Sequence, residues 1–180
     1  MFSFFVCYCL TRKVYYNSIV KIRKSTKSHV SASLKDLEKK GLVVMCGIVG
    51  YIGEEQAAPI LLNGLQKLEY RGYDSAGVAV YNDTGVHVVK SKGRLSVLDG
   101  ILQGGKELPG TVGIGHTRWA THGAPSDVNS HPQVSDGGLF AVVHNGIIEN
   151  YLYLKNHLIR RGVEFVSDTD TEVVAQMLEY

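Results

Sequence analysis

The sequence of 180 residues lacks several features that would place it in common classes of protein. No stretch of roughly 18 apolar residues occurs, so we expect no membrane-spanning helix. No internal repeat, low-complexity tract or heptad pattern is present. Only three cysteines occur, an odd number, and their positions do not form a disulfide framework. This cysteine usage indicates a reducing compartment, and we expect the protein in the cytoplasm.

The usual motifs for phosphate, dinucleotide and zinc binding are also missing. There is no GxxxxGK[ST] phosphate loop, and Gly47, Gly50 and Gly53 are spaced by three residues rather than in the GxGxxG pattern. His116 and His122 lie six residues apart without a neighbouring Cys or acid, which matches no common zinc spacing. We therefore expect neither a metal site nor a cofactor.

Basic residues are scarce outside the N-terminal quarter of the chain. Residues 1–44 hold nine Lys or Arg against two acids, a formal charge of +7, whereas the whole chain carries +2. The remaining residues therefore carry −5, and they show no basic face in the sequence. Because nucleic-acid binding depends on clustered Lys and Arg, we expect no nucleic-acid partner.

Enough apolar residues are present for one domain with a hydrophobic core, since 44% of the chain is hydrophobic and 20% is charged. Composition divides the chain into a basic extension, residues 1–44, and a domain, residues 45–180. Short apolar runs between turn residues predict strands, and apolar residues at helical spacing predict helices. The predicted strands are 46–52, 76–81, 86–90, 112–116, 139–143 and 163–166, and the predicted helices are 56–69, 149–161 and one that starts near Asp170.

Local signals support some of these boundaries. Residues 82–85 have turn chemistry and predict a hairpin between the second and third strands. Gly162 is typical of a helix C-terminus. Thr169 and Glu172 have the spacing of a capping box at the start of the last helix. Strands in pairs with helices between them predict an α+β or sandwich-like layered fold.

The two ends of the chain are unusual. Residues 1–10 are apolar and aromatic, and basic residues follow them, which is the reverse of a signal peptide. We interpret residues 1–44 as absent from the mature protein, with Met45 as the true start; a short basic membrane anchor is the alternative. The chain stops inside the last predicted helix, which we interpret as a truncation of a longer sequence.

Cys46 follows Met45 directly and opens a predicted strand. After removal of a methionine, this cysteine would be the first residue of the chain. A free α-amine has a pKa of about 7.7–8.0, so part of it is neutral at pH 7 and can act as the base for the thiol of its own residue. The alternative is a buried strand cysteine, which is usually inert.

Charged and polar residues cluster at two further turns. Arg71 and Asp74 lie between a predicted helix and a predicted strand, where they form either a structural ion pair or part of a site. Arg118 and Thr121 follow the strand 112–116, and an Arg–Thr pair can bind a carboxylate.

An amide and an acid complete the candidate residues. Asn145 and Gly146 follow the strand 139–143, where a side-chain amide beside a glycine N–H forms either an oxyanion hole or an ordinary Asn-Gly turn. Asp170 lies at a predicted helix start, where it serves as a cap or pairs with a ligand ammonium group.

Five segments in order resemble the glutaminase domain of the glutamine–fructose-6-phosphate aminotransferase (isomerizing) family, which are class II glutamine amidotransferases. The resemblance covers residues 46–180, about three quarters of the chain. It implies the four-layered αββα fold of N-terminal nucleophile hydrolases, an α+β fold, incomplete at the C-terminus. The five segments are CGIVGYIG (46–53), LEYRGYDSAG (68–77), HTRWATHG (116–123), HNGIIEN (144–150) and SDTDTE (167–172).

The resemblance also implies a role for each candidate residue in hydrolysis of L-glutamine to glutamate and ammonia. A free N-terminal cysteine would attack the amide and form a glutamyl thioester, which water would then hydrolyse. The implied roles are Cys46 as nucleophile, Asn145 and Gly146 as oxyanion donors, Arg118 for the glutamine carboxylate, Asp170 for its ammonium group, Thr121 and His122 as pocket lining, Arg71 as support for the nucleophile and Trp119 at the exit for ammonia.

Family members act on fructose 6-phosphate through sugar-isomerase domains that this chain lacks, and their full-length enzymes are homo-oligomers. We therefore expect L-glutamine as the partner of this chain itself. Two alternatives remain open. In the first alternative, the chain is an inactive or blocked glutamine-binding fragment, because residues before Cys46 would turn its α-amine into an amide. Otherwise it is the amidotransferase domain of a related enzyme such as amidophosphoribosyltransferase.

Overall fold

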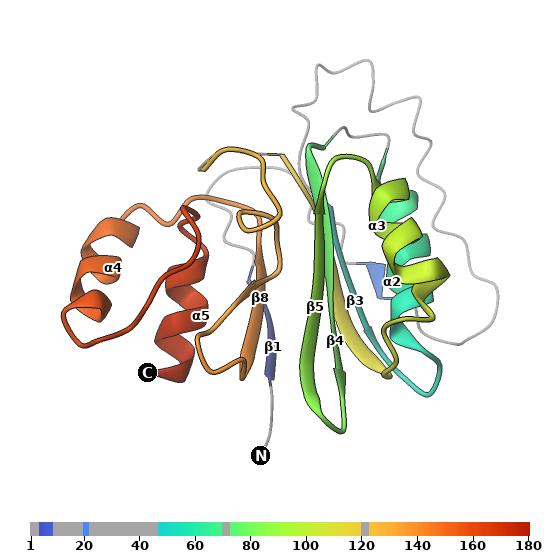
Figure 1. Ribbon diagram of the computed structural model, residues 1–180, viewed down its shortest axis with the longest axis horizontal. Coiled ribbons are helices and arrows are strands. Elements are labelled where there is room, and N and C mark those ends of the chain that lie inside the picture. Colours follow the sequence, from blue (N-terminus) through green and yellow to red (C-terminus); the bar gives the residue numbers. More distant parts are fainter. Residues whose placement is uncertain (1–3, 9–19, 22–46, 70–72, 120–122) are drawn as a thin grey trace.

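The computed structural model describes residues 4–8, 20–21, 47–69, 73–119 and 123–180. These residues form four layers, in which one pair of helices covers a five-stranded sheet, a three-stranded sheet packs on the other face of that sheet, and a second pair of helices lies outside the smaller sheet (Figure 1). The predicted α+β fold with αββα layers is confirmed.

The five-stranded sheet has the strand order β2-β3-β6-β4-β5. All neighbours are antiparallel except β2 and β3, which are parallel. The central strand β6 is therefore hydrogen-bonded on both sides, to β3 and to β4. The strands are β2 (Val20–Lys21), β3 (Gly47–Ile52), β4 (Ser75–Asn82), β5 (Gly85–Lys92) and β6 (Val112–Arg118).

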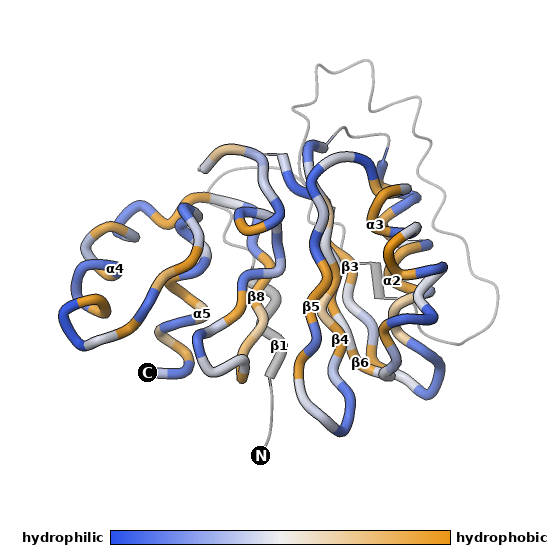
Figure 2. Tube along the Cα trace, viewed as in Figure 1, coloured by the Kyte–Doolittle hydropathy of each residue, from blue (hydrophilic) through white to orange (hydrophobic). Residues whose placement is uncertain are grey.

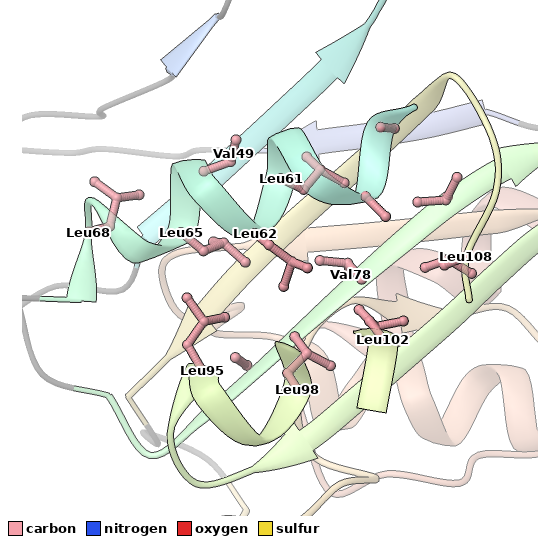
Figure 3. Close-up of a cluster of buried hydrophobic side chains, with 14 residues drawn as sticks. Val49, Leu61, Leu62, Leu65, Leu68, Val78, Leu95, Leu98, Leu102 and Leu108 are labelled. Atoms are coloured by element: carbon pink, nitrogen blue, oxygen red, sulfur yellow. The ribbon is translucent and has the colours of Figure 1, made fainter. Parts of the chain in front are cut away.

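Helices α2 (Ala57–Gln66) and α3 (Leu95–Leu102) cover one face of this sheet, and the short 3-10 turn η2 (Gln103–Gly105) follows α3. Figure 3 shows their leucines converging over strand β4. Hydrophobic residues lie along β4, β5 and β8, and hydrophobic and hydrophilic residues alternate along the helices (Figure 2). The buried cluster includes Val49, Leu61, Leu65, Val78, Leu95, Leu98 and Leu102.

The three-stranded sheet has the order β1-β8-β7, with β1 (Phe4–Tyr8) parallel and β7 (Gln133–Val134) antiparallel to β8 (Phe140–His144). Helices α4 (Tyr151–Ile159) and α5 (Glu172–Glu179) lie on its outer side (Figure 1). A second buried cluster fills the space between the two sheets and consists of Ile48, Ala79, Ile114, Ala141 and Val143. Residues 114, 116 and 118 of β6 share the face that meets the smaller sheet, because side chains alternate along a strand.

Most predicted elements are present. The hairpin forms between β4 and β5, with Asn82 opposite Gly85. Gly162 has a φ of +87° and closes α4, with the N–H of Gly162 donating to Ile159 O and that of Val163 donating to Leu158 O. The sequence analysis did not predict α3 or β7.

Two predictions are wrong. Residues 163–166 are not a strand, because their backbone groups bond to side chains instead: Val166 N donates to Glu172 and the Glu164 carbonyl accepts from Gln176. The capping box does not form either. Helix α5 starts at Glu172, and the Glu172 carboxylate accepts from Val166 and Ser167 rather than from the backbone of Thr169.

The basic extension contributes two strands that were not predicted. β1 lies on the edge of β8, and β2 lies on the edge of β3. Backbone pairing therefore connects segments of residues 1–44 to both sheets. Across the described ranges, no helix has the length and apolar character needed to cross a membrane.

Candidate active site

Four of the candidate residues lie outside the described part of the chain, namely Cys46, Arg71, Thr121 and His122. Gly47, the next residue in the sequence, is described and is the first residue of β3. The Gly47 N–H donates to the Thr117 hydroxyl at 3.0 Å, in a buried bond between β3 and β6. A side chain on Gly47 would meet Leu68, so the chain after Cys46 is tightly enclosed.

Arg118 is the last residue of β6, next to the start of β3, and its side chain is 3% exposed. Its Nη2 donates to the backbone carbonyl of Gly123 at 3.2 Å. Burial of a guanidinium is costly unless polar groups surround it, so this position is one where an anionic group binds favourably. Trp119 follows directly and is 51% exposed, so its indole ring is half in solvent.

Asn145 and Gly146 begin the segment after β8, residues 145–148, which we call the Asn145 loop. The Asn145 Oδ1 lies 2.8 Å from the Nε2 of His116 on β6. Gly146 has a φ of +156°, and a Cβ at this position would lie 2.9 Å from the His144 ring. Both the φ and this contact favour glycine at position 146.

Asp170 belongs to the segment before α5, residues 167–170, which we call the Asp170 loop. Its carboxylate is buried and accepts a hydrogen bond from the Ile148 N–H at 2.7 Å, which joins the Asp170 loop to the Asn145 loop. Thr171, the next residue, lies 3.3 Å from the His144 ring nitrogen. Asp170 thus supports the segment that carries Asn145, a role that the sequence analysis did not predict.

Asn129 connects the Arg118 side of the site to the Asp170 loop. Its amide nitrogen donates to Ala124 O at 2.9 Å and to the Asp168 carboxylate at 3.2 Å, and its Oδ1 accepts from the Asp168 N–H at 2.9 Å. The residue is almost fully buried. Gly123, the carbonyl partner of Arg118, packs against Asn129 with a φ of +74°. These bonds connect residues 123 and 124 to the Asp170 loop.

The Asp170 loop is anchored from behind by Glu172, which is 0% exposed. The Glu172 carboxylate accepts from Val166 N at 2.9 Å, from Ser167 N at 2.7 Å and from the Ser167 hydroxyl at 2.6 Å. Charge-assisted bonds of this kind are about twice as strong as neutral ones. Glu172 therefore sets the backbone that presents Asp170.

Three buried histidines, His116, His131 and His144, lie near one another, and the first two are also near Arg118. The pKa of His116 is lowered to about 4, chiefly by burial; the charge of Arg118 also lowers it, and the hydrogen bond to Asn145 opposes the shift. Burial likewise holds the pKa of His131 well below its usual range. Burial lowers the pKa of His144, although Asp170 opposes this shift. These rings are neutral at pH 7.

Hydrogen bonds and the short stretches of backbone between them thus connect Arg118, Asn145, Gly146 and Asp170 in one network. Three residues that hold this network were not predicted from the sequence. They are His116 as a support, Asn129 and Glu172. Their partners are 29, 39 and 5 or 6 residues away in sequence, so for the first two no local motif identifies the pairing. No three His, Cys, Asp or Glu side chains are grouped as possible metal ligands within the described ranges.

Comparison with known proteins gives consistent results. A family model described as "Glutamine amidotransferase domain" matches residues 103–180. The glutamine–fructose-6-phosphate aminotransferase [isomerizing] of Caldanaerobacter subterraneus subsp. tengcongensis is 64% identical over 137 residues, which are 76% of this chain and 22% of that protein. The protein of the same name from Clostridium perfringens is 58% identical over 136 residues, with the same coverage. The chain thus spans about a fifth of the length of these relatives.

Solved structures show the same fold. The glutamine phosphoribosylpyrophosphate (PRPP) amidotransferase of B. subtilis, complexed with ADP and GMP, superposes with a TM-score of 0.60 at 30% sequence identity. The superposition covers 73% of this chain and 29% of that one.

Proposed function

Because the chain carries a glutamine amidotransferase domain, we propose that it hydrolyses the side-chain amide of L-glutamine to glutamate and ammonia, with Cys46 as the nucleophile. The observation that supports this proposal best is the Asn145 loop. The Asn145 amide is held by His116, Gly146 follows it in sequence, and the Asp170 carboxylate holds the backbone of the same loop at Ile148. This arrangement suits an oxyanion, since preorganised donors stabilise developing negative charge without reorganisation.

In the first half of the proposed reaction, the Cys46 sulfur attacks the amide carbon of glutamine. The thiol proton passes to the α-amine of Cys46, and the carbonyl oxygen becomes an oxyanion that accepts hydrogen bonds from Asn145 Nδ2 and Gly146 N–H. The α-amine then gives its proton to the departing nitrogen, so that ammonia leaves and a glutamyl thioester remains.

The second half releases the product. The α-amine takes a proton from a water molecule, whose oxygen attacks the thioester carbon. The second tetrahedral intermediate collapses with cleavage of the carbon–sulfur bond, and the thiolate recovers the proton. Glutamate leaves and the free thiol is restored.

Substrate binding in this proposal relies on opposite charges. Arg118 would pair with the glutamine carboxylate, which is consistent with its buried position at the end of β6. Asp170 would pair with the ammonium group while it keeps its bond to Ile148, because a carboxylate has four acceptor sites. Thr121, His122, Arg71 and Trp119 keep their proposed roles as pocket lining, support for Cys46 and the exit for ammonia.

The names of the relatives indicate where the ammonia would be used. We propose that it aminates fructose 6-phosphate to glucosamine 6-phosphate through sugar-isomerase domains beyond this chain, in a homo-oligomeric enzyme. A cytoplasmic location would keep the Cys46 thiol reduced. The identity of 64% to an enzyme of that name, against 30% to the PRPP amidotransferase, favours this assignment over the amidophosphoribosyltransferase alternative.

A blocked glutamine-binding form is the second candidate, and the pairing of β1 and β2 with the domain supports it. If residues 1–44 remain attached, the nitrogen of Cys46 is an amide and cannot act as a base. Such a chain would bind glutamine without turnover.

N-terminal sequencing and intact mass of the protein from its native cells distinguish the two forms. A chain that begins at Cys46 should hydrolyse glutamine, and Cys46→Ala should abolish that activity while glutamine still binds. Activity that survives Cys46→Ala would refute the mechanism. A chain that begins at Met1 and binds glutamine without hydrolysing it would establish the blocked form.

A further inference from the structure

The His116 ring contacts the Asn145 side-chain oxygen, and the consequence of this contact for the orientation of the amide can be worked out. The ring is fully buried on β6, between the two sheets. Its Nε2 lies 2.8 Å from Asn145 Oδ1. The two residues are 29 positions apart in sequence: His116 lies in the five-stranded sheet, and Asn145 directly follows β8 of the three-stranded sheet.

The geometry determines which ring nitrogen carries the proton. An amide oxygen only accepts hydrogen bonds, so the hydrogen must lie on Nε2. A neutral imidazole then has a bare Nδ1, and that atom is buried without a hydrogen-bond partner in the described part of the chain. Burial lowers the pKa of His116 to about 4, so the ring keeps this single proton at neutral pH.

This bond also determines the orientation of the Asn145 amide. With Oδ1 bound to the imidazole, Nδ2 must lie on the side of the amide that faces away from the ring. The opposite orientation would direct Oδ1 toward the site, where its partial negative charge would repel an oxyanion. Rotation of the amide by 180° would therefore convert a stabilising donor into a destabilising acceptor.

We propose that His116 is a positioning residue for the glutaminase reaction, in which its Nε2–H holds the Asn145 side chain in the orientation that presents Nδ2 to the oxyanion. The inference rests on the proposed function of the Asn145 loop. His116 acts only through Asn145 and does not touch the substrate.

The surroundings of His116 are rigid enough for this task. Its strand is paired on both sides, with His116 opposite Ile48 of β3 and Gly77 of β4. The backbone carbonyl of His131 packs against Gly77, where no Cβ would fit. The rings of His131 and His116 lie 4.6 Å apart. The donor is thus held by a central strand, whereas its acceptor lies in a loop.

A double-mutant cycle tests the proposal in the form of the protein, with the N-terminus found in native cells, that hydrolyses glutamine. Asn145→Ala should lower kcat by roughly 10²–10³-fold, the usual effect of losing one oxyanion donor. His116→Leu should lower kcat by about 10–10²-fold with little change in KM. In the Asn145→Ala background, His116→Leu should have almost no further effect, because its target is already gone. An equal loss in both backgrounds would overturn the proposal.

His116→Gln serves as the conservative variant, since its amide can donate to Asn145 Oδ1 from a similar position. It should recover a large part of the kcat lost in His116→Leu. If both variants lower kcat and thermal stability to the same extent, His116 is only structural.

A spectroscopic measurement separates this proposal from the proposed function. Nitrogen-15 NMR of the wild-type chain should show His116 as the Nε2–H tautomer, with a shift of that resonance in Asn145→Ala. A proton on Nδ1 overturns the role of His116 even in an active enzyme. If the tautomer is correct but no N-terminal form hydrolyses glutamine, the proposed function fails, and the role of His116 falls with it.

Discussion

At the scale of single residues, Gly146 and Gly138 form a matched pair. Both have positive φ, +156° and +72°, but a Cβ on Gly146 would lie 2.9 Å from the His144 ring, whereas Gly138 has open space around it. We expect Gly146→Ala to lower kcat by about tenfold or more, because the loop must shift and would displace the proposed oxyanion donor. Gly138→Ala should cost only about 1 kcal/mol of stability from backbone strain.

Steady-state glutaminase kinetics and thermal unfolding of both variants make the comparison. An equal change of kcat in the two variants would mean that strain in the backbone, rather than the position of the Gly146 N–H, determines the rate.

Arg118→Lys tests the binding of the glutamine carboxylate. A lysine keeps the positive charge but loses the planar fork, so it cannot bind a carboxylate through two parallel bonds. Because a hydrogen bond to a charged group contributes about 1.5–3 kcal/mol, KM should rise by roughly 10–100-fold, with a smaller change in kcat. Arg94→Lys, at an exposed arginine before α3, is the control. An unchanged KM for Arg118→Lys would remove Arg118 from the substrate site.

At the scale of elements, Glu172 couples the start of α5 to the Asp170 loop. Glu172→Gln replaces one carboxylate oxygen by an NH₂ group that faces the N–H and O–H donors of residues 166 and 167. We expect a loss of about 1–3 kcal/mol in the free energy of unfolding. KM for glutamine should also rise, because the loop that carries Asp170 is loosened.

Urea unfolding and glutaminase kinetics measure both effects. Glu164→Gln, at an exposed side chain in the preceding segment, is the control and should change neither quantity. A Glu172→Gln variant with lower stability but unchanged KM would show that the Asp170 loop keeps its position without Glu172.

The interface between the two sheets predicts a dependence of stability on pH. The folded chain lowers the pKa of His116 from its usual 6.5 to about 4, so between these values the unfolded chain binds more protons. The stabilisation is complete above about pH 6.5 and is lost as the pH falls toward 4. Burial also lowers the pKa values of His131 and His144, so both residues add to the loss of stability at low pH. Arg118 lowers the pKa of His131 as well, whereas Asp170 opposes the shift at His144.

Urea unfolding at several pH values should show this loss. The share of His116 is roughly 3 kcal/mol at most, from its pKa shift. His116→Gln should flatten the curve between pH 4 and 6.5, and His87→Gln, at an exposed ring, should leave it unchanged. A wild-type stability that is constant over this range would show that the histidines are accessible to protons in the folded state.

Features that depend on residues close in sequence were predicted, whereas features that depend on contacts between distant residues were not. The β4–β5 hairpin and the end of α4 depend on local turn chemistry, and both were predicted. Residues 163–166 have strand propensity, but no neighbouring strand pairs with them, so side chains of α5 take their hydrogen bonds instead. In the candidate site, motifs predicted roles for Arg118 and Asn145, which stay predictions, whereas no motif indicated Asn129, whose partner is 39 residues away.

At the scale of the whole molecule, the extension has two separable effects. Removal of residues 1–44 deletes β1 and β2, which exposes an edge of β8 and an edge of β3. Removal of residues 1–45 also frees the α-amine of Cys46. We expect both shortened chains to lose stability by a similar amount, but only the chain that begins at Cys46 to hydrolyse glutamine.

A chain that starts at Met45 and retains this methionine is the matched control, because it lacks the same strands but has an amide nitrogen at Cys46. Glutaminase assays and thermal unfolding of the three chains give the comparison. Equal activity in the Met45 and Cys46 chains would show that the α-amine is not the base.

The layered arrangement also divides the histidines by their access to reagents. His116 and His131 lie between the sheets, whereas His87 and His157 lie on the surface. An acylating reagent such as diethyl pyrocarbonate should therefore modify His87 and His157 in the folded protein and reach His116 and His131 only after the two sheets separate. Mass spectrometry of the modified positions would then measure how often the two sheets separate, without any substrate or assay of turnover.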